Sequence, residues 1–188
     1  MSEIKIVVIG GSAGSFSVVG KILSGIRSDF PLPVLVCMHR LKHIRSGFAE
    51  SLDERASLPV TEPYDKDSIE GGHVYLAPAN YHMYVEYNDT ISLSIEEPSN
   101  YCRPALDNTF TSVAQVYGEK CVGIILTGAN KDGAEGLKSI ADHGGVTIVQ
   151  DPSTADVATM PQAALRLIKP TYVLSPQGII DYLNNMEI

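Results

Sequence analysis

The sequence predicts an α/β domain: a doubly wound, mostly parallel sheet with helices on both faces and an added antiparallel hairpin patch. Short runs of Val, Ile and Leu alternate along the chain with segments whose apolar residues recur at helical spacing, which is typical of repeated strand–helix units. The apolar runs are continuous, as in parallel strands buried on both faces. Hydrophobic residues make up 44% of the 188, so we expect residues 1–188 to form one domain around a sizeable core.

The parallel part begins with a buried strand over Ile4–Ile9, and a glycine-rich turn follows at Gly10–Gly14. Apolar residues between Phe16 and Ile26 recur at helical spacing and predict a helix. Further buried strands are expected at Pro33–Met38, Val122–Leu126, Val146–Gln150 and Thr171–Leu174. Further helices are expected at Ser46–Ala56, Asp107–Tyr117, Ala134–His143, Pro161–Leu167 and Gln177–Asn184.

The middle of the chain has a different pattern. Short segments rich in Val, Ile and Tyr occur at Gly72–Ala77, Met83–Tyr87 and Ile91–Ile95. Asn88-Asp89 between the last two is a plausible hairpin turn. We therefore expect these three segments to form an antiparallel patch beside the parallel sheet.

Composition narrows the classes of partner and cofactor. The net charge of −8 argues against a nucleic-acid partner, because such proteins carry a basic face or stripe. The longest basic cluster, residues 40–45, is short and interrupted, and we interpret it as a solvated loop or helix start. No metal-ligand spacing occurs, so no metal or organic cofactor is expected.

Cysteine usage and the N-terminus predict the compartment. Cys37, Cys102 and Cys121 are odd in number and widely spaced, which favours reduced thiols in the cytoplasm, and Cys37 and Cys121 are expected to be buried. The apolar run near the N-terminus is too short for a signal peptide or a membrane span. We therefore expect a cytoplasmic protein without direct membrane insertion.

The first candidate for chemistry is Ser12, in Gly10-Gly11-Ser12-Ala13-Gly14. The segment satisfies Gly-x-Ser-x-Gly in the strand–turn–helix context that a nucleophilic serine requires. A sharp turn lifts the hydroxyl out of the sheet, and the free N–H groups of the next helix face a developing oxyanion. The motif alone equally fits a glycine-rich turn or a phosphate-binding loop. A dinucleotide site is disfavoured, because serine replaces two of the three required glycines and no acidic residue ends the second strand.

Two further candidates follow other buried strands. His39 ends the second strand, and Asp132 lies in the loop after Val122–Leu126. Because ligand crevices form outside the carboxyl ends of strands, we expect Ser12 and His39 to lie within reach of each other, with Asp132 accepting from the ring. Structural roles stay open: a lone histidine is often structural, and Asp132 is also a favoured N-cap of the next helix. The chain order serine, histidine, aspartate differs from that of α/β-hydrolases.

Six segments, in the right order over nearly the whole chain, resemble the catalytic domain of the chemotaxis-receptor methylesterases (protein-glutamate methylesterases). They are Val7–Gly14, His39 after its strand, Gly72–Pro78 with His82, Arg103–Asp107, Leu126–Gly128 with Asp132–Gly136, and Gly145–Asp151 with Met160–Ala164.

The resemblance implies hydrolysis of glutamate γ-methyl esters on the cytoplasmic helices of chemoreceptors, with release of methanol, and it extends to deamidation of glutamines at such sites. It implies that Ser12 is the nucleophile, His39 the general base and acid, and Asp132 the group that orients His39. The oxyanion hole or substrate pocket is expected to include the residues Ala13, Gly14, Ala129 and Arg103. Arg103 would contact acidic groups beside the target glutamate, with a structural surface role as the alternative.

Three positions depart from the family pattern: Ala13 stands where threonine is common, Arg40-Leu41 where Met-Pro is common, and Ala129 where methionine is common. None removes a member of the triad, so they bear on substrate preference more than on chemistry. Many family members begin with a receiver domain. Because the first strand here begins near Ile4, we expect a stand-alone esterase, constitutively active or controlled by a separate receiver-domain protein.

Two other functions stay open. One is a non-catalytic interaction module within a signalling assembly, which covalent labelling of Ser12 would distinguish from an enzyme. The other is an esterase acting on a different protein or on a small-molecule ester.

Overall fold

A computed structural model describes residues 3–40 and 47–186 of the protein. Its centre is a seven-stranded, all-parallel sheet with the strand order β3-β4-β2-β1-β7-β8-β9. The strands are β1 (Ile6–Gly11), β2 (Val34–Met38), β3 (Val60–Thr61), β4 (Val74–Leu76), β7 (Cys121–Ile125), β8 (Val146–Gln150) and β9 (Tyr172–Leu174). A separate antiparallel pair consists of β5 (His82–Val85) and β6 (Ile91–Ser94).

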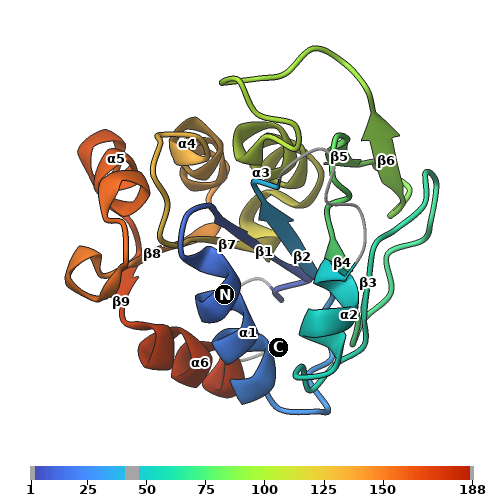
Figure 1. The fold of residues 1–188 in the computed structure, drawn as a ribbon, viewed down its shortest axis with the longest axis horizontal. Coiled ribbons are helices and arrows are strands. Elements are labelled where there is room, and N and C mark those ends of the chain that lie inside the picture. Colours follow the sequence, from blue (N-terminus) through green and yellow to red (C-terminus); the bar gives the residue numbers. More distant parts are fainter. Residues whose placement is uncertain (1–2, 41–46, 187–188) are drawn as a thin grey trace.

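Helices cover both faces of the sheet (Figure 1). They are α1 (Ser15–Gly25), α2 (Phe48–Asp53), α3 (Leu106–Tyr117), α4 (Ala134–Asp142), α5 (Thr159–Leu167) and α6 (Pro176–Asn185). Alternate residues of β1 serve the two cores: Val7 and Ile9 pack with α1, α2 and α6, whereas Ile6 and Val8 pack with α3, α4 and α5. Burial on both faces explains why the strand is a continuous apolar run.

The predicted fold class is confirmed, but the middle of the chain needs one correction. The segment predicted at Gly72–Ala77 does not join the antiparallel patch, because β4 pairs with β2 in parallel. Val74 and Leu76 lie in one core and Tyr75 in the other, so this short strand is buried on both faces. The other two segments do form the predicted hairpin, and Asp89 in its turn has a φ of 57°.

Several boundaries and one strand also differ from the prediction. Strand β3 was not predicted, because two residues are too few to produce an apolar run. Helix α5 starts at Thr159, before Pro161. The predicted helix Ser46–Ala56 is described only from residue 47 on, where α2 spans Phe48–Asp53.

The basic cluster at residues 40–45 is described only at Arg40, and there the solvated interpretation is wrong. Arg40 is buried, forms an ion pair with Glu62, and lies 4.7 Å from the centre of the Phe48 ring. A buried guanidinium needs such partners, since an unpaired charge in the interior is costly.

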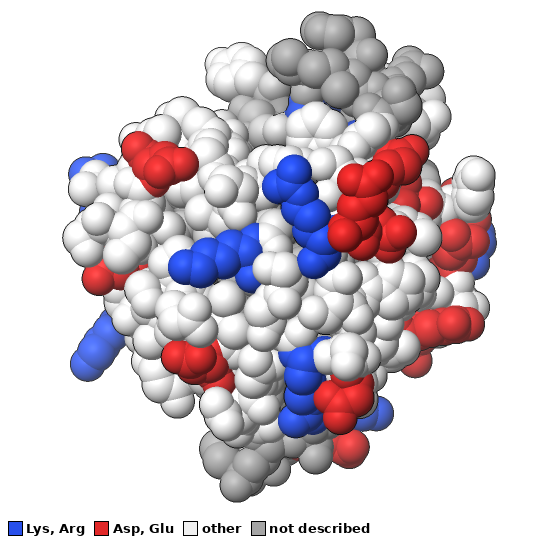
Figure 2. Space-filling view, turned by 60° about the horizontal axis from the view of Figure 1, so that its bottom comes forward, with Lys and Arg blue, Asp and Glu red and all other residues white. Residues whose placement is uncertain are grey.

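Lysine and arginine are interspersed with acidic residues over the face shown in Figure 2, and they do not gather into a stripe on its described part. Within residues 3–40 and 47–186, no helix is both long enough and apolar enough to cross a bilayer.

Glycines inside two helices provide a test of the packing. A Cβ at Gly136 of α4 would lie 2.6 Å from Cβ of Phe110 and 3.0 Å from Cα of Asp107, whereas one at Gly20 of α1 would meet only Leu52, at 3.9 Å. We expect Gly136→Ala to lower the free energy of unfolding by roughly 1–3 kcal/mol through overpacking. Gly20→Ala should raise it by roughly 0.5–1 kcal/mol, because alanine loses less backbone entropy in a helix. Urea unfolding checks both, and equal effects would contradict the close α3–α4 contact.

Candidate active site

The candidate residues lie at the carboxyl edge of three adjacent strands. Ser12 follows β1 directly, His39 follows β2 directly, and Asp132 lies in the loop between β7 and α4. Strand β1 lies between β2 and β7, and the chain extends the sheet first on the β2 side and then on the β7 side. This reversal of strand order is the topological switch point at which open α/β sheets bind ligands.

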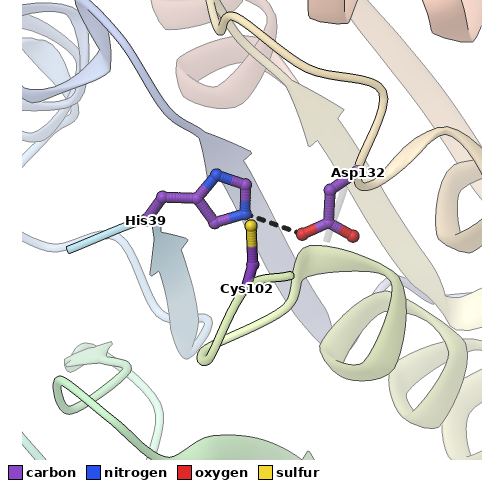
Figure 3. A group of neighbouring side chains, drawn as sticks. All are labelled: His39, Cys102 and Asp132. Carbon is purple, nitrogen blue, oxygen red and sulfur yellow. Dashed lines mark hydrogen bonds and ion pairs between the residues drawn. The ribbon is translucent and has the colours of Figure 1, made fainter. Parts of the chain in front are cut away.

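The three side chains form one hydrogen-bonded line. Nδ1 of His39 lies 3.0 Å from Oγ of Ser12, and Nε2 of His39 lies 2.7 Å from Oδ2 of Asp132. Figure 3 shows the ring and the carboxylate facing each other. When the ring is neutral, Nε2–H donates to the ionised Asp132, which leaves Nδ1 as the acceptor for the Ser12 hydroxyl.

Backbone hydrogen bonds hold the turn that carries Ser12. The Ser12 N–H donates to the carbonyl of Thr127 at 2.9 Å, and the Ser15 N–H donates to the carbonyl of Ser12 at 2.9 Å. Gly14 has a φ of 79°, and a Cβ there would lie 2.7 Å from a carboxylate oxygen of Asp156. Both the backbone conformation and the close neighbour therefore require glycine at this position.

Among residues 3–40 and 47–186, backbone N–H groups without an acceptor occur next to Ser12 in the chain and in the β7–α4 loop. Ala13, Gly14 and Ala129 are exposed, and within the described part of the chain their N–H groups donate no hydrogen bond. Ala13 and Gly14 immediately precede α1, whose N-terminal end adds a partial positive charge. These N–H groups suit the role of an oxyanion hole.

Asp132 does cap a helix, although not the one that follows it. The N-cap residue of α4 is Gly133. The Asp132 carboxylate instead accepts from the N–H groups of Leu106 (2.7 Å) and Asp107 (3.1 Å), at the start of α3. Asp107 in turn accepts from the N–H groups of Gly133 (2.9 Å) and Gly136 (2.8 Å), at the start of α4. Asp132, just before α4, thus caps α3, and Asp107, in the first turn of α3, caps α4; we call this the exchange of capping carboxylates.

The electrostatics of the pair favour an ion pair. Burial of His39 opposes its protonation, but the hydrogen bond to Asp132 and the neighbouring Cys102 outweigh this and raise the pKa of His39 to about 9. Burial also works against ionisation of Asp132, yet hydrogen bonds from His39 and from two backbone N–H groups hold the pKa of Asp132 below its usual value. Asp132 therefore stays ionised at neutral pH.

Sequence reasoning missed three polar side chains around this line. Nδ2 of Asn130 lies 3.3 Å from Nδ1 of His39, and Oδ1 of Asn130 accepts from the Asp132 N–H at 3.0 Å. Asn100 donates to both Asp107 (2.8 Å) and Asp132 (3.1 Å). The sulfur of Cys102 lies beside the ring nitrogen that faces Asp132 (Figure 3). None of these three side chains has a local sequence signature. Asp107, to which Asn100 donates, does end a segment that resembles the family.

Arg103 is engaged within the chain. Its guanidinium donates to Oδ1 of Asn80 at 3.2 and 2.8 Å, and to the carbonyls of Ile95 (2.7 Å) and Glu96 (2.8 Å). Four of its five N–H groups are therefore used to hold the loop before α3. This geometry favours the structural alternative over the expected contact with substrate.

The fold and the Ser12–His39–Asp132 line together define a class of protein: doubly wound α/β domains in which three side chains are arranged as in serine hydrolases. Their order along the chain is serine, histidine, aspartate. Residues 7–183 match the family model described as CheB methylesterase. The chain belongs to the CheB methylesterase family.

Individual relatives agree with this assignment. A putative protein-glutamate methylesterase/protein-glutamine glutaminase of Leptospira interrogans is 38% identical over 186 residues, which cover 96% of each chain. Protein-glutamate methylesterase/protein-glutamine glutaminase 4 of Geobacter metallireducens is 40% identical over all of this chain, which spans 54% of that relative. The crystal structure of the Thermotoga maritima CheB methylesterase catalytic domain superimposes with a TM-score of 0.91 at 32% identity, covering 97% of this chain and 98% of that one.

The exchange of capping carboxylates can be tested by stability. Asp107→Ala leaves the Gly133 and Gly136 N–H groups without their acceptor, and we expect it to lower the free energy of unfolding by about 1–2 kcal/mol. Asp107→Asn keeps an acceptor oxygen and should lose less. As a control, Asp142→Ala at the other end of α4 removes only an exposed pair with Lys138, worth roughly 0.3–0.5 kcal/mol. Equal losses from Asp107→Ala and Asp142→Ala in urea unfolding would contradict the capping role.

Proposed function

We propose that this chain hydrolyses the γ-methyl esters of glutamate side chains, with Ser12 as nucleophile, His39 as general base and acid, and Asp132 orienting His39. The observation that carries the proposal is the unbroken line of hydrogen bonds from the Ser12 hydroxyl through His39 to Asp132. Family membership supports the reaction type.

In the first half of the reaction, Oγ of Ser12 attacks the ester carbonyl carbon while its proton passes to Nδ1 of His39. The carbonyl oxygen becomes an oxyanion, which in this proposal is stabilised by the N–H groups of Ala13, Gly14 and Ala129. Asp132 stabilises the imidazolium that forms. The tetrahedral species then collapses, and His39 returns the proton to the departing methoxide, which leaves as methanol.

In the second half, His39 takes a proton from water, and the resulting nucleophile attacks the acyl-enzyme carbonyl. Collapse releases the glutamate carboxylate, and His39 returns the proton to Ser12. The same sequence with ammonia as the leaving group deamidates glutamine, an activity that the names of both relatives include. We propose glutamine deamidation as a second reaction of this site.

The proposed substrates are the methylated cytoplasmic helices of chemoreceptors, so the proposed location is the cytoplasm. Control by a separate receiver-domain protein also belongs to the proposal. If the purified chain were inert until a receiver protein was added, constitutive activity would be ruled out in favour of that control.

Mutation of the nucleophile tests the reaction. Ser12→Ala is expected to lower the rate of methanol release from methylated chemoreceptor by about 10⁴-fold or more, since only binding and oxyanion stabilisation remain. Ser17→Ala is the matched control, because Ser17 is exposed on α1 and lies outside the triad. Full release by the Ser12 variant would refute the assignment. Hydrolysis of p-nitrophenyl acetate without release from receptor would favour a different ester substrate.

The pH dependence tests the base. His39 must be neutral to accept a proton, and its pKa is raised to about 9. We expect kcat/KM to rise roughly tenfold per pH unit below that pKa and to level off above it, measured with a chelator present. Asp132→Asn removes the carboxylate that raises the pKa, so the rise should move to lower pH while kcat falls. A wild-type profile that is already flat at pH 7 would contradict the His39–Asp132 ion pair.

A further inference from the structure

Cys102 adds a third potential metal ligand to the His39–Asp132 pair. The side chains of His39, Cys102 and Asp132 each offer one ligand atom, and these atoms all lie within 4.8 Å of one another. Figure 3 shows the three side chains converging from separate segments, with the sulfur beside the ring nitrogen that bonds Asp132. Neither the reaction proposed above nor the packing of the core uses this thiol.

A histidine nitrogen, a cysteine sulfur and a carboxylate oxygen are the donor types that Zn²⁺ takes in proteins. Tetrahedral zinc with bonds of about 2.0–2.3 Å holds its ligand atoms roughly 3.3–3.8 Å apart. The observed limit of 4.8 Å therefore requires only small side-chain movements. We propose that His39, Cys102 and Asp132 form a Zn²⁺ site with water in the fourth position, and that the bound metal inhibits the esterase.

The surroundings orient two of the three ligands. Asp132 is buried and fixed by the N–H groups of Leu106 and Asp107. The backbone of Cys102 is tied to Ser99 by two hydrogen bonds, of 3.1 and 2.8 Å. Outer partners of this kind orient ligands toward a metal. The His39 side chain is 14% exposed, and Cys102 is also partly exposed, so an ion can reach the site from solvent.

Inhibition follows from which nitrogen of the metal-bound His39 ring carries the proton. On binding, the Cys102 thiol releases its proton to solvent and a Zn–S bond forms. A ring protonated on both nitrogens binds through Nε2 and releases the Nε2 proton to solvent, so the neutral, metal-bound ring carries its single proton on Nδ1. Nδ1 faces Ser12, and once protonated it donates and can no longer accept the serine proton. This consequence rests on the proposed catalytic roles, whereas metal binding itself does not.

Binding is tested first, without any assay of activity. Co²⁺ titrated into the purified protein should give a sulfur-to-cobalt charge-transfer band, which Zn²⁺ displaces. The band should persist in Ser12→Ala, which removes no ligand, and in Cys121→Ser, whose buried thiol lies at the start of β7. It should vanish in Cys102→Ser and in Cys102→Ala. When titrated with Zn²⁺ by calorimetry, the two Cys102 variants should bind with an affinity more than about 10-fold below that of wild type, the least that loss of a ligand should cost.

Inhibition is tested second, with each variant compared with its own activity in EDTA. Zn²⁺ should suppress methanol release by wild type and by Cys121→Ser, and EDTA should restore it. Cys102→Ser should need more than about 10-fold more Zn²⁺ for the same fractional loss. Equal metal affinity in wild type and Cys102→Ser would overturn the site. A thiolate-dependent band in wild type without loss of activity would overturn the inhibition, and it would leave the proposed esterase reaction standing.

Discussion

The Asp132 carboxylate is the group on which the site and its surroundings jointly depend. It accepts from His39, from two N–H groups at the start of α3, and from Asn100. Asn100 also donates to Asp107, which caps α4. A buried carboxylate must be compensated by hydrogen bonds, and here the compensation comes from His39, from the start of α3 and from Asn100. The position of the His39 ring is therefore coupled to the packing of α3 against α4.

The parallel sheet explains why three distant segments can meet. Strands β2, β1 and β7 are neighbours with all carboxyl ends at one edge, so the residues that follow them share one crevice. Ser12 and His39 follow their strands without any intervening loop. Asp132 reaches the crevice from a longer loop that also presents Ala129 and Asn130. Rigid strand ends place Ser12 and His39, while the β7–α4 loop adds Asp132 and the Ala129 N–H.

The arrangement that suits a general base also suits a metal ion. A histidine held by a buried carboxylate presents its nitrogen in a fixed direction, which is a requirement of catalysis and of ligation alike. The proposed metal site differs from the catalytic line by including Cys102, whose sulfur lies beside the His39–Asp132 pair. The loop that carries it is held by Arg103 through the carbonyls of Ile95 and Glu96.

The sequence by itself determined the parallel strands, most of the helices, and Ser12, His39 and Asp132 as candidates. These features have local signatures: continuous apolar runs, helical spacing, a Gly-x-Ser-x-Gly turn and polar residues directly after strands. Only the tertiary structure decided that β4 belongs to the parallel sheet, that Asp132 caps α3 instead of α4, and that Cys102 and Asn130 lie against His39. Those facts depend on contacts between segments far apart in the chain, 91 residues for His39 and Asn130. Local propensity and periodicity carry no information about such contacts, because they arise when helices pack on the assembled sheet.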